Sequence, residues 1–463
     1  MENKFYTTPI YYVNDKPHIG HAYTSISVDV LKRFHKLKGI DTYFLTGTDE
    51  HGQKVEKAAQ DKNIDPKKFT DQVSENFRAL SDVLNLDNDD FIRTTEERHK
   101  TSVQNLWQRL IDNDEIYLSK YAGWYSVRDE AFVAENEITE VNGIKFNSFG
   151  SELSWVEEES YFFRLSKWQN RLLELYDEVP DFVHPKSRLN EVKSFVSRGL
   201  RDLSVSRTTF NWGIDVPNDD KHIMYVWLDA LTNYISALGF PDQNNDKYKA
   251  FWPGIHIVGK DILRFHAVYW PAFLMAADLL PPKQIVAHGW WTNEGEKISK
   301  SLGNVIDPIE LINLYGLDQL RYFLMREVPF GNDGDFSKDA MINRINGDLS
   351  NNFGNLIQRV LSFIFKNSNQ TIDFTDEILE FDIYKNIISS ENKLYELMNK
   401  YSFDGYLKVI FAHLNDLNTF VDRSAPWELR KTDHIKMKEV LDQISICILK
   451  ITQLLAPFIP NGA

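Results

Sequence analysis

The sequence contains a single cysteine, Cys447, among its 463 residues. This excludes an intramolecular disulfide and any metal site built on several thiolates. No uninterrupted apolar run reaches the roughly 18 residues that a membrane-spanning helix needs. The N-terminal residues 1–6 lack the basic segment and the apolar core of a signal peptide. Together these absences are typical of a protein of the reducing cytoplasm that has no membrane anchor.

The sequence also lacks an excess of basic residues. It has 52 Lys and Arg but 67 Asp and Glu, which gives a net charge of −15. The average field argues weakly against a nucleic-acid partner, yet a locally positive cleft can still hold phosphate groups. The 43% hydrophobic and 26% charged residues are an ordinary globular balance. A chain of this length is expected to form two to four domains.

Apolar spacing predicts an α/β block at the start of the chain, followed by an insertion. The block has strands at 5–12 and 41–46, with a helix at 20–38 between them. Residues 118–157 are rich in turn and strand signals and are interpreted as the insertion. Helical spacing resumes at 161–175.

A second α/β block is expected to start near Met224. Its predicted helix, strand, helix and strand occupy residues 224–238, 255–258, 261–279 and 284–287. Asp307 followed by Pro308 is typical of an N-cap and a first helical position. From about residue 346 the strand signals vanish and helical spacing continues, which predicts a helical bundle.

The strongest local motif is His18-Ile19-Gly20-His21, which follows a predicted strand and opens a predicted helix. The first backbone N–H groups of a helix are unpaired and carry partial positive charge, so this position can bind an anion. Two imidazoles there can donate to phosphate oxygens, and Gly20 leaves room for a nucleotide to approach the backbone. The alternative is a pair of ordinary surface histidines.

A second motif, Lys297-Ile298-Ser299-Lys300-Ser301, lies far along the chain, after the second α/β block. Its small and polar residues indicate a mobile loop. Two lysines in such a loop can neutralise phosphate charge as a leaving group departs. The alternative is a solvated run of charges, but the two motifs together are far more specific than either alone.

With these two motifs the sequence resembles the class I aminoacyl-tRNA synthetases, whose signatures are HIGH and KMSKS. The single departure is Ile298 in place of methionine, which leaves both lysines in position. Within this class the chain is most similar to the methionyl-tRNA synthetases. The stretches that carry this resemblance are TPIYY at 8–12, GTDEHG at 47–52, YVWLDA at 225–230, GKDI at 259–262, FH at 265–266 and WPA at 270–272.

The resemblance implies an α/β fold, with a Rossmann-type parallel-sheet catalytic domain, an inserted connective subdomain, and an all-α anticodon-binding bundle after them. The first half of the catalytic domain is expected at 1–117 and its second half, with the KISKS loop, at 221–345. The connective insertion and its return helices are expected at 118–220, and the bundle at 346–463.

The resemblance also implies a methionine site. In the family, the residues matching Ile10 and Asp49 hold the backbone of the amino acid, with Asp49 offsetting the α-ammonium charge. The residues matching the walls of the pocket are Tyr12, Val226, Trp227, Ala230, Tyr234, Ile262, His266 and Trp270. A polarizable thioether favours aromatic walls, and Tyr234 and His266 can each approach the sulfur as a donor. The alternative is that these aromatic residues are simply core.

For ATP, the family's ribose contacts match Gly259 and Asp261, and the adenine is expected against the backbone from His288 to Trp291. Arg207 matches an arginine near the substrate carboxylate, with a surface salt bridge as the alternative. The further residues expected to contact ATP or to act in catalysis are His18, Gly20, His21, Lys297 and Lys300. Mg²⁺ is expected to accompany ATP, held mainly by phosphates and water.

Two departures from the family's pattern affect the expected sites. Leu231 stands where the family carries a proline after the pocket alanine, so the edge of the pocket is expected to differ. Many members have a zinc knuckle in the insertion, but here Ser126 stands where a ligand cysteine often lies, and Cys447 is far away. No zinc and no metal-ligating residue are therefore expected.

Three residues of the predicted bundle match the family's anticodon readers. Asn355 and Arg359 are four apart on one predicted helix, and Trp427 follows Ala425-Pro426. The resemblance implies that they read the CAU anticodon, with the tryptophan stacked on a base and the other two at base edges. The alternatives are an exposed polar face for Asn355 and Arg359, and a core position for Trp427.

The implied function is the ATP-dependent activation of L-methionine and its transfer to the 3′ end of tRNA(Met), by a cytoplasmic monomer without a membrane partner. One alternative is another class I synthetase for an aliphatic amino acid, and a second is a smaller nucleotidyltransferase with a similar histidine motif. A third is an inactive tRNA-binding paralogue, against which the intact histidines and lysines of both motifs argue.

Overall fold

The computed structural model describes residues 2–13, 16–128, 131–133, 135–298, 304–368, 371–373 and 376–463. The chain divides into two compact units. The first comprises Met1–Pro17 and His35–His288, and the second comprises His18–Phe34 and Gly289–Ala463. Within the described residues, none of the helices combines the length and the apolar character that crossing a membrane requires.

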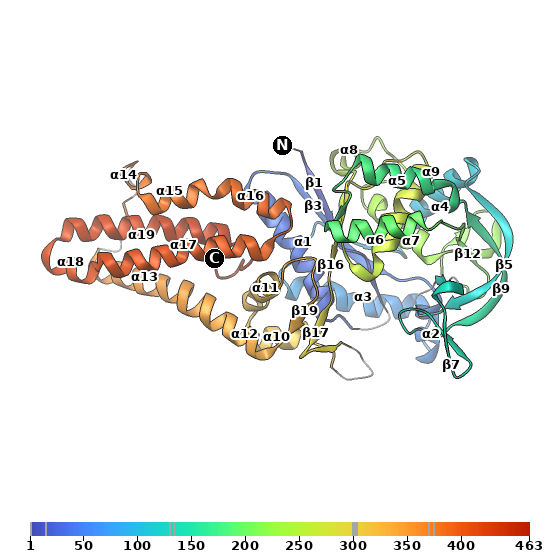
Figure 1. Ribbon diagram of the computed structural model, residues 1–463, viewed down its shortest axis with the longest axis horizontal. Coiled ribbons are helices and arrows are strands. Elements are labelled where there is room, and N and C mark those ends of the chain that lie inside the picture. Colours follow the sequence, from blue (N-terminus) through green and yellow to red (C-terminus); the bar gives the residue numbers. More distant parts are fainter. Residues whose placement is uncertain are drawn as a thin grey trace. The chain divides into compact units, whose positions relative to one another are not determined.

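The first unit is built on a seven-stranded sheet whose order is β10-β16-β15-β1-β3-β2, with β4 also paired to β3 (Figure 1). Every pairing is parallel. The strands are β1 (Lys4–Thr7), β2 (Tyr11–Tyr12), β3 (Thr42–Asp49), β4 (Asp90–Arg93), β10 (Val183–His184), β15 (Ile255–Gly259) and β16 (Gln284–His288). All of β3 is buried, as expected of a parallel strand that is covered on both faces.

The carboxyl ends of these parallel strands meet at one edge of the sheet. Asp49 ends β3, Gly259 ends β15 and His288 ends β16, while Thr8 directly follows β1. In open α/β sheets, ligands bind in the crevice outside the carboxyl ends of the strands. The fold therefore brings the segments predicted to hold the amino acid and the ribose to the edge where ligands bind.

Helices pack around this sheet, and their apolar faces supply its core. They are α2 (Gln53–Asp61), α3 (Pro66–Val83), α4 (Glu97–Asp112), α5 (Gln169–Glu178), α6 (Lys186–Ser197), α7 (Val226–Ser236), α8 (Asp246–Phe251) and α9 (Trp270–Ala276). All residues of α7 are buried, including four polar ones, so this helix is covered on every side. It carries four of the predicted pocket residues.

Antiparallel strands occupy much of the chain between β4 and β15. The longest pair is β5 (Ile116–Ser126) with β9 (Ser154–Phe163), aligned from Ile116 opposite Phe163 to Tyr125 opposite Ser154. The shorter strands are β6 (Ala131–Val133), β7 (Thr139–Val141), β8 (Ile144–Phe146), β11 (Leu203–Ser204), β12 (Ser206–Arg207), β13 (Asp215–Val216) and β14 (Asp219–Met224).

The second unit contains a small three-stranded sheet and the C-terminal helices. Strand β17 (Trp291–Asn293) lies between β18 (Glu296–Lys297) and β19 (Gly334–Phe336). The helices after it are α10 (Pro308–Tyr315), α11 (Leu317–Arg326), α12 (Lys338–Arg344), α13 (Asn355–Asn367), α14 (Asp376–Leu379), α15 (Asp382–Ser389), α16 (Glu391–Asn399), α17 (Phe403–Ser424), α18 (Pro426–Thr432) and α19 (His434–Leu455). Helices α13, α17 and α19 run side by side as a bundle (Figure 1).

Helix α1 (Ile19–Leu37) begins in the second unit and is anchored there by a buried ion pair. Asp29 accepts a hydrogen bond of 2.5 Å from Arg321 Nη2, and both side chains are fully buried. The same guanidinium donates to the carbonyls of Pro457 and Phe458. Because Nε and Nη2 are used in this way, the buried charge is paired and hydrogen-bonded rather than isolated.

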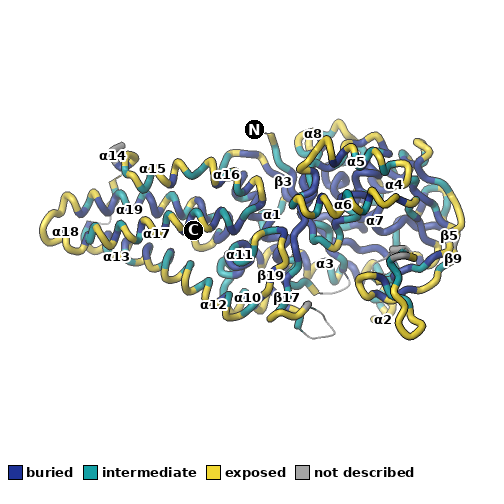
Figure 2. The backbone as a smooth tube through the Cα atoms, in the orientation of Figure 1, coloured by how far each residue is buried: buried dark blue, intermediate teal, exposed yellow. Residues whose placement is uncertain are grey.

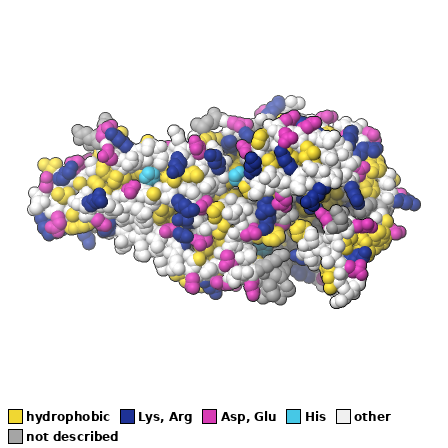
Figure 3. Space-filling model, in the orientation of Figure 1, with side chains coloured by type: hydrophobic (Ala, Val, Ile, Leu, Met, Phe, Trp, Pro, Cys, Tyr) yellow, Lys and Arg dark blue, Asp and Glu magenta, His cyan; other side chains and the backbone are white. Residues whose placement is uncertain are grey.

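Burial alternates with exposure along α17 and α19, as Figure 2 shows, which is the pattern of amphipathic helices around a shared core. On the face drawn in Figure 3, basic and acidic side chains are interspersed. The net charge of −15 therefore does not form one unbroken acidic field on that face. Local basic positions remain available to an anionic partner.

The predicted helix 20–38, strands 255–258 and 284–287, and the N-cap at Asp307 are confirmed. The predicted strand 5–12 is wrong in its middle, because Pro9, which has no N–H, separates β1 from β2. The helix predicted from 161 starts only after β9 ends at Phe163. Strand β10 lies inside the predicted insertion but pairs with the parallel sheet. The sequence did not predict this pairing, because a strand of two residues has no recognisable pattern.

Candidate active site

Three predicted pocket residues form a buried cluster in the first unit. Tyr234 comes from α7, His266 from the π-helical turn Phe265–Tyr269, and Trp270 from the start of α9. Their side chains are 0–1% exposed. The ring of Tyr234 lies 5.8 Å from that of His266 and 6.1 Å from that of Trp270. A π-helical turn often marks a functional site, and here it re-aims His266 toward α7.

The hydrogen bonds of His266 fix its protonation. Its Nδ1 lies 2.9 Å from the carbonyl oxygen of Ile262, which can only accept, so Nδ1 carries the proton. Burial lowers the pKa of His266 to about 4, so the ring is neutral at pH 7 and its Nε2 is an acceptor. The Tyr234 hydroxyl, 2.7 Å away, therefore donates to Nε2. That Tyr234 and His266 can each approach a substrate sulfur as a donor stays a prediction, since here the two side chains contact each other.

Sequence reasoning missed His256, which stacks on the pocket tyrosine. Its ring lies 3.8 Å from that of Tyr234 at an interplanar angle of 23°. Its two nitrogens contact Thr7 Oγ1 at 2.9 Å and Trp270 Nε1 at 3.3 Å. A histidine inside the apolar run of β15 was the available signal, but only the pairing of β15 with β1 shows what it meets.

The other predicted pocket residues surround this cluster. Trp227 stacks on Phe265 with ring centroids 3.7 Å apart and planes 5° apart. The indole N–H of Trp227 is buried and has no partner among the described side chains, so an acceptor on a bound ligand would satisfy it. The residues Val226, Ala230, Ile10, Tyr12 and Ile262 are buried or half-buried.

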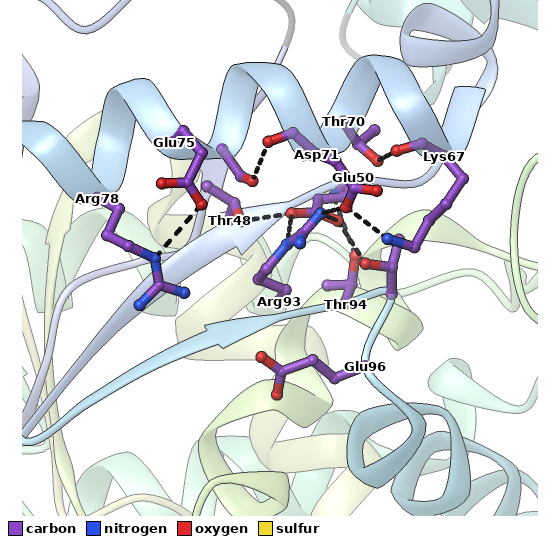
Figure 4. A network of polar contacts seen from close by, with 12 residues as sticks. Thr48, Glu50, Lys67, Thr70, Asp71, Glu75, Arg78, Arg93, Thr94 and Glu96 are labelled. Carbon is purple, nitrogen blue, oxygen red and sulfur yellow. Dashed lines mark hydrogen bonds and ion pairs between the residues drawn. The ribbon is translucent and has the colours of Figure 1, made fainter. Parts of the chain in front are cut away.

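Asp49 is buried at the end of β3 and is followed by a segment held by a polar network (Figure 4). Arg93 donates to both carboxylate oxygens of Glu50, at 2.6 and 2.9 Å. Thr48 and Thr95 donate to the same carboxylate at 2.7 and 2.6 Å. A carboxylate that accepts a bidentate pair and two further hydrogen bonds is held rigidly. The backbone next to Asp49 is therefore fixed.

A second buried carboxylate ties this segment to the pocket helix. Asp229 of α7 contacts His51 Nδ1 and His99 Nε2, both at 2.7 Å. Burial by itself raises the pKa of Asp229, but its contacts with the two histidines outweigh burial and hold the pKa at about 2. Because Asp229 lies between Trp227 and Ala230 in the sequence, this contact fixes the pocket helix against the segment that carries Asp49.

Arg207 is buried in β12, and its expected alternative as a surface salt bridge is wrong. Its Nη1 donates to Ser204 Oγ at 2.8 Å and to the Ser206 carbonyl at 2.7 Å. The guanidinium also lies 4.7 Å from the ring centroid of Tyr225 and 5.2 Å from that of Tyr125. A desolvated guanidinium held in this way can present a fixed positive charge to a carboxylate.

At the predicted ribose end, Gly259 lies opposite His288 in the register of β15 and β16. A Cβ atom at Gly259 would approach Asp261 Oδ1 to 2.5 Å, so a larger residue there would displace this exposed carboxylate. The indole of Trp291 belongs to the core of the second unit, 5.5 Å from the ring of Tyr23. That the adenine contacts the backbone of Trp291 stays a prediction.

The two motif histidines lie in the second unit with their rings 3.9 Å apart. His18 Nδ1 accepts from the Gly20 N–H at 3.1 Å, and His21 Nδ1 accepts from the His18 N–H at 3.0 Å. Burial, followed by the influence of His18, lowers the pKa of His21 well below its usual value, so the ring is neutral. With Nδ1 used as an acceptor, neutral rings carry their protons on Nε2, which makes Nε2 a donor suited to an anion.

The segment that follows the second motif contacts the first motif through the backbone. The Ile19 N–H donates to the Ile306 carbonyl at 3.0 Å, and Asn293 Nδ2 donates to the Asn304 carbonyl at 3.0 Å. The segment that follows the KISKS motif is therefore held at the start of α1. Lys300 lies outside the described residues, as do Ser299 and residues 301–303, and of Lys297 only the backbone, in β18, is described.

The three predicted anticodon residues gather on the bundle. Arg359 of α13 lies 6.0 Å from the ring centroid of Trp427, and its Nη1 is 2.9 Å from Asp422 Oδ1. Trp427 is 36% exposed, which argues against a core role. Trp427 comes two residues after Ala425, a non-glycine residue in the left-handed conformation at φ 41°. The turn that presents the indole is therefore strained. Asn355 starts α13 and is exposed.

No group of three or more His, Cys, Asp or Glu side chains with the geometry to hold a metal occurs among the described residues. Ser126, at the position of the family's zinc ligand, is buried at the end of β5 opposite Ala131. Its neighbours Asp129 and Glu130 lie outside the described residues. The donor set that is described does not fit a zinc knuckle.

Comparison with known proteins agrees with this geometry. The family model of the class I tRNA synthetases (M) matches residues 4–361. The methionine–tRNA ligase of Rickettsia bellii is 58% identical over 470 residues, covering 100% of this chain and 92% of that protein. The methionine–tRNA ligase of Brucella suis is 52% identical over 469 residues, covering 100% of this chain and 90% of that protein.

A solved structure of the Mycobacterium tuberculosis methionyl-tRNA synthetase in complex with methionyl-adenylate superimposes with a TM-score of 0.96. It is 42% identical in sequence, and the match covers 100% of this chain and 92% of that one. The parallel sheet, the paired motifs and these matches define a class I aminoacyl-tRNA synthetase. The chain belongs to the methionyl-tRNA synthetase family within that class.

Proposed function

We propose that this protein is a methionine–tRNA ligase, which activates L-methionine with ATP and transfers it to the 3′ end of tRNA(Met). The observation that carries the proposal is the buried aromatic pocket of Trp227, Tyr234, His266 and Trp270 on the unit that also holds Asp49. Such a pocket offers polarizable, uncharged walls to a thioether. The relatives that match the whole chain carry the same activity in their names.

In the first step, a carboxylate oxygen of methionine attacks the α-phosphate of ATP, and the bond to the β-phosphate breaks to release pyrophosphate. Asp49 would pair with the α-ammonium and Arg207 would lie toward the carboxylate. Asp49 is fixed by the Glu50 network and by the pocket helix through Asp229. No side-chain nucleophile is needed, because the reaction is accelerated by positioning and by electrostatic stabilisation.

The phosphates of ATP would be met by the Nε2–H groups of His18 and His21 and by the ammonium groups of Lys297 and Lys300. Neutral histidine donors suit ATP that arrives with Mg²⁺, since the ion already offsets part of the charge. Gly259 and Asp261 would hold the ribose, with the adenine against the backbone from His288 to Trp291. Gly20 and Gly259 both lack room for a Cβ atom, at 2.9 and 2.5 Å from a neighbouring side chain.

In the second step, the 3′-terminal ribose hydroxyl of the tRNA takes the methionyl group and AMP leaves. Trp427, Arg359 and Asn355 would read the anticodon from the bundle. The exposed indole and the neighbouring guanidinium give the stacking surface and the cation that single-stranded bases need. On this proposal the catalytic halves are 1–117 and 221–345, the connective insertion is 118–220, and the bundle is 346–463.

ATP–pyrophosphate exchange tested against all twenty amino acids decides the first step. Methionine should support exchange far above the others, and the same preparation should charge tRNA(Met). Exchange with leucine, isoleucine or valine instead would assign another class I specificity. Binding of tRNA without any exchange would identify an inactive paralogue. Elemental analysis of the active protein adds a further check, since stoichiometric zinc would contradict the expected zinc-free insertion.

A further inference from the structure

A group of buried serines surrounds the guanidinium of Arg207. Ser204 ends β11, Ser206 begins β12, and Ser160 lies in β9, which pairs with β11. The side chains of these four residues are 0–4% exposed. The turn between two short strands therefore brings hydroxyl groups and a charged side chain together away from water, where each polar atom needs a partner.

The direction of these hydrogen bonds follows from Arg207, since a guanidinium can only donate. Its Nη1 donates to Ser204 Oγ at 2.8 Å and to the Ser206 carbonyl at 2.7 Å, which uses both protons of that nitrogen. Ser160 Oγ lies 3.1 Å from two carbonyl oxygens, those of Ser206 and Tyr161, so its proton has an acceptor. The Ser204 hydroxyl, 2.6 Å from Ser160 Oγ, therefore accepts from Arg207 and donates to Ser160.

The hydroxyl of Ser204 differs from that of Ser206 in what it contacts. Within the described part of the chain, Ser204 Oγ is hydrogen-bonded to two side chains, Arg207 and Ser160, and to no backbone group. Ser206 Oγ instead accepts from the backbone N–H of Tyr161 at 2.8 Å. The hydroxyl of Ser206 thus supports the pairing of strands, whereas that of Ser204 supports the guanidinium.

Arg207 lies at the start of the pocket helix. The Tyr225 N–H donates to the Val205 carbonyl at 2.8 Å, and the guanidinium is 4.7 Å from the ring centroid of Tyr225. Tyr225 is the N-cap of α7, two residues before Trp227. The ring of Tyr125 lies 5.2 Å from the same guanidinium. With both protons of Nη1 anchored and two aromatic rings beside it, the planar fork of Arg207 has one fixed orientation.

We propose that Ser204 is a positioning residue, whose hydroxyl, held by Ser160, orients Arg207 toward the carboxylate of the amino-acid substrate. This inference rests on the proposed function, in which Arg207 lies toward that carboxylate. A guanidinium binds a carboxylate strongly only when its planar fork is aligned with the two oxygens. Without the Ser204 hydroxyl, Nη1 keeps only one of its two acceptors, and the fork can turn about the hydrogen bond that remains.

A pair of ligands tests this role: L-methionine, and L-methioninol, in which an uncharged alcohol replaces the carboxylate. In Ser204→Ala we expect the affinity for methionine to fall about 10- to 100-fold, as the loss of one well-aligned hydrogen bond between charged groups implies. The affinity for methioninol should remain near the wild-type value, because this ligand has no carboxylate for Arg207 to meet. Equilibrium dialysis measures both affinities, and pyrophosphate exchange should show the loss in kcat/KM for methionine.

Three further variants separate the hydroxyl from the packing of the side chain. Ser204→Cys keeps the shape, but a thiol is a weak hydrogen-bonding group, so it should show the same selective loss as alanine. Ser204→Thr keeps the hydroxyl and should retain most of the affinity for methionine. Ser206→Ala removes a neighbouring buried hydroxyl but keeps the carbonyl that Arg207 uses, so any loss should be equal for the two ligands. Melting curves check that each variant is folded.

A double-mutant cycle with Arg207→Gln shows whether Ser204 acts through the guanidinium. Arg207→Gln should weaken methionine far more than methioninol, and adding Ser204→Ala should cause no further loss. Additive losses in the double variant, equal losses of both ligands in Ser204→Ala, or an unchanged affinity for methionine would each overturn the inference.

Failure of the proposed function gives a different result. If Arg207→Gln binds methionine as the wild type does, the proposed role of Arg207 is wrong, and the inference fails with it. A wild-type protein without methionine-dependent exchange would overturn the proposed function itself.

Discussion

The polar side chains of the methionine pocket and those of the anticodon face differ in what surrounds them. Behind the pocket, Tyr234, His256 and His266 are almost fully buried and neutral, and each is hydrogen-bonded to another buried group. On the bundle, Arg359 and Asp422 form an ion pair whose side chains are 34% and 63% exposed. The first arrangement is suited to a small neutral side chain, and the second to a solvated polyanion.

This difference predicts which property each region controls. Buried groups without water depend on their partners, so changes in the pocket should alter both stability and amino-acid selection. Exposed charges are screened and exchange partners easily, so changes on the bundle should alter tRNA recognition with little effect on stability. Substitutions that affect the two reaction steps together would break this comparison.

The largest effect is expected from Lys300→Ala in the KISKS motif. The lysine meets phosphate charge mainly in the transition state, so adenylate formation should slow about 10²- to 10³-fold. Methionine binding should change little, because the pocket is built from other residues. Pre-steady-state formation of methionyl-adenylate measures the rate, and equilibrium dialysis with methionine measures binding. A wild-type rate of pyrophosphate exchange would show that the loop is only a solvated run of charges.

The second largest effect is loss of stability in acid, and it should come from the pocket. Burial lowers the pKa of His266 from 6.5 to about 4, so between these values the unfolded chain binds more protons than the folded one. Stability therefore falls as the pH drops through this window, by about 3 kcal/mol for His266 alone. His256 acts in the same direction. Asp229, whose pKa is held at about 2 in the folded protein, adds to this slope only below about pH 5, where its carboxylate begins to protonate in the unfolded chain.

Calorimetry at several pH values measures that slope, and His266→Gln gives the matched control. The variant should be less stable at pH 7 but should lose less further stability between pH 6.5 and pH 4. An unchanged slope in the variant would mean that the acid sensitivity originates elsewhere.

Much of the pocket could be predicted because its residues lie in contiguous motifs. Trp227 and Tyr234 share one face of α7, and the local spacing of His266 and Trp270 was visible in the sequence. The role of His256 was not visible, since it depends on the register between β1 and β15, which the sequence does not encode locally. The direction of hydrogen bonding likewise required the three-dimensional partners of each nitrogen.

The same contrast holds for the fold. The helix at 20–38 and the strands at 255–258 and 284–287 have strong apolar patterns and were predicted to within a residue or two. Strand β10 pairs through only two residues, Val183 and His184, so tertiary contacts rather than propensity create it. For Trp427, the spacing allowed either a core or a surface position, and only its exposure favours the second.

A smaller effect, confined to the second step, is expected from Trp427→Ala. A stacked base is worth roughly 1–3 kcal/mol, so kcat/KM for tRNA should fall about 5- to 150-fold. Pyrophosphate exchange should be nearly unchanged, because methionine and ATP are bound by other residues. Aminoacylation kinetics and melting curves test this together. A large drop in melting temperature with parallel losses in both reactions would restore the core interpretation.

The smallest effect is expected from Asp422→Asn on stability. The variant removes the charge that faces Arg359 Nη1 at 2.9 Å but keeps a side chain that can still accept a hydrogen bond. Exposed ion pairs contribute only about 0.2–1 kcal/mol, because solvent screens them and two long side chains must be ordered. Arg359 also keeps Asn418 as a second partner.

The buried pair of Asp29 and Arg321 in the same unit gives the matched contrast. Asp29→Asn leaves a desolvated guanidinium without its counter-charge and should cost about 3–5 kcal/mol. Denaturant unfolding of the two variants measures both values. Equal losses would mean that the anticodon face is as tightly coupled to folding as the buried core, which would remove the distinction between a surface for binding and an interior for stability.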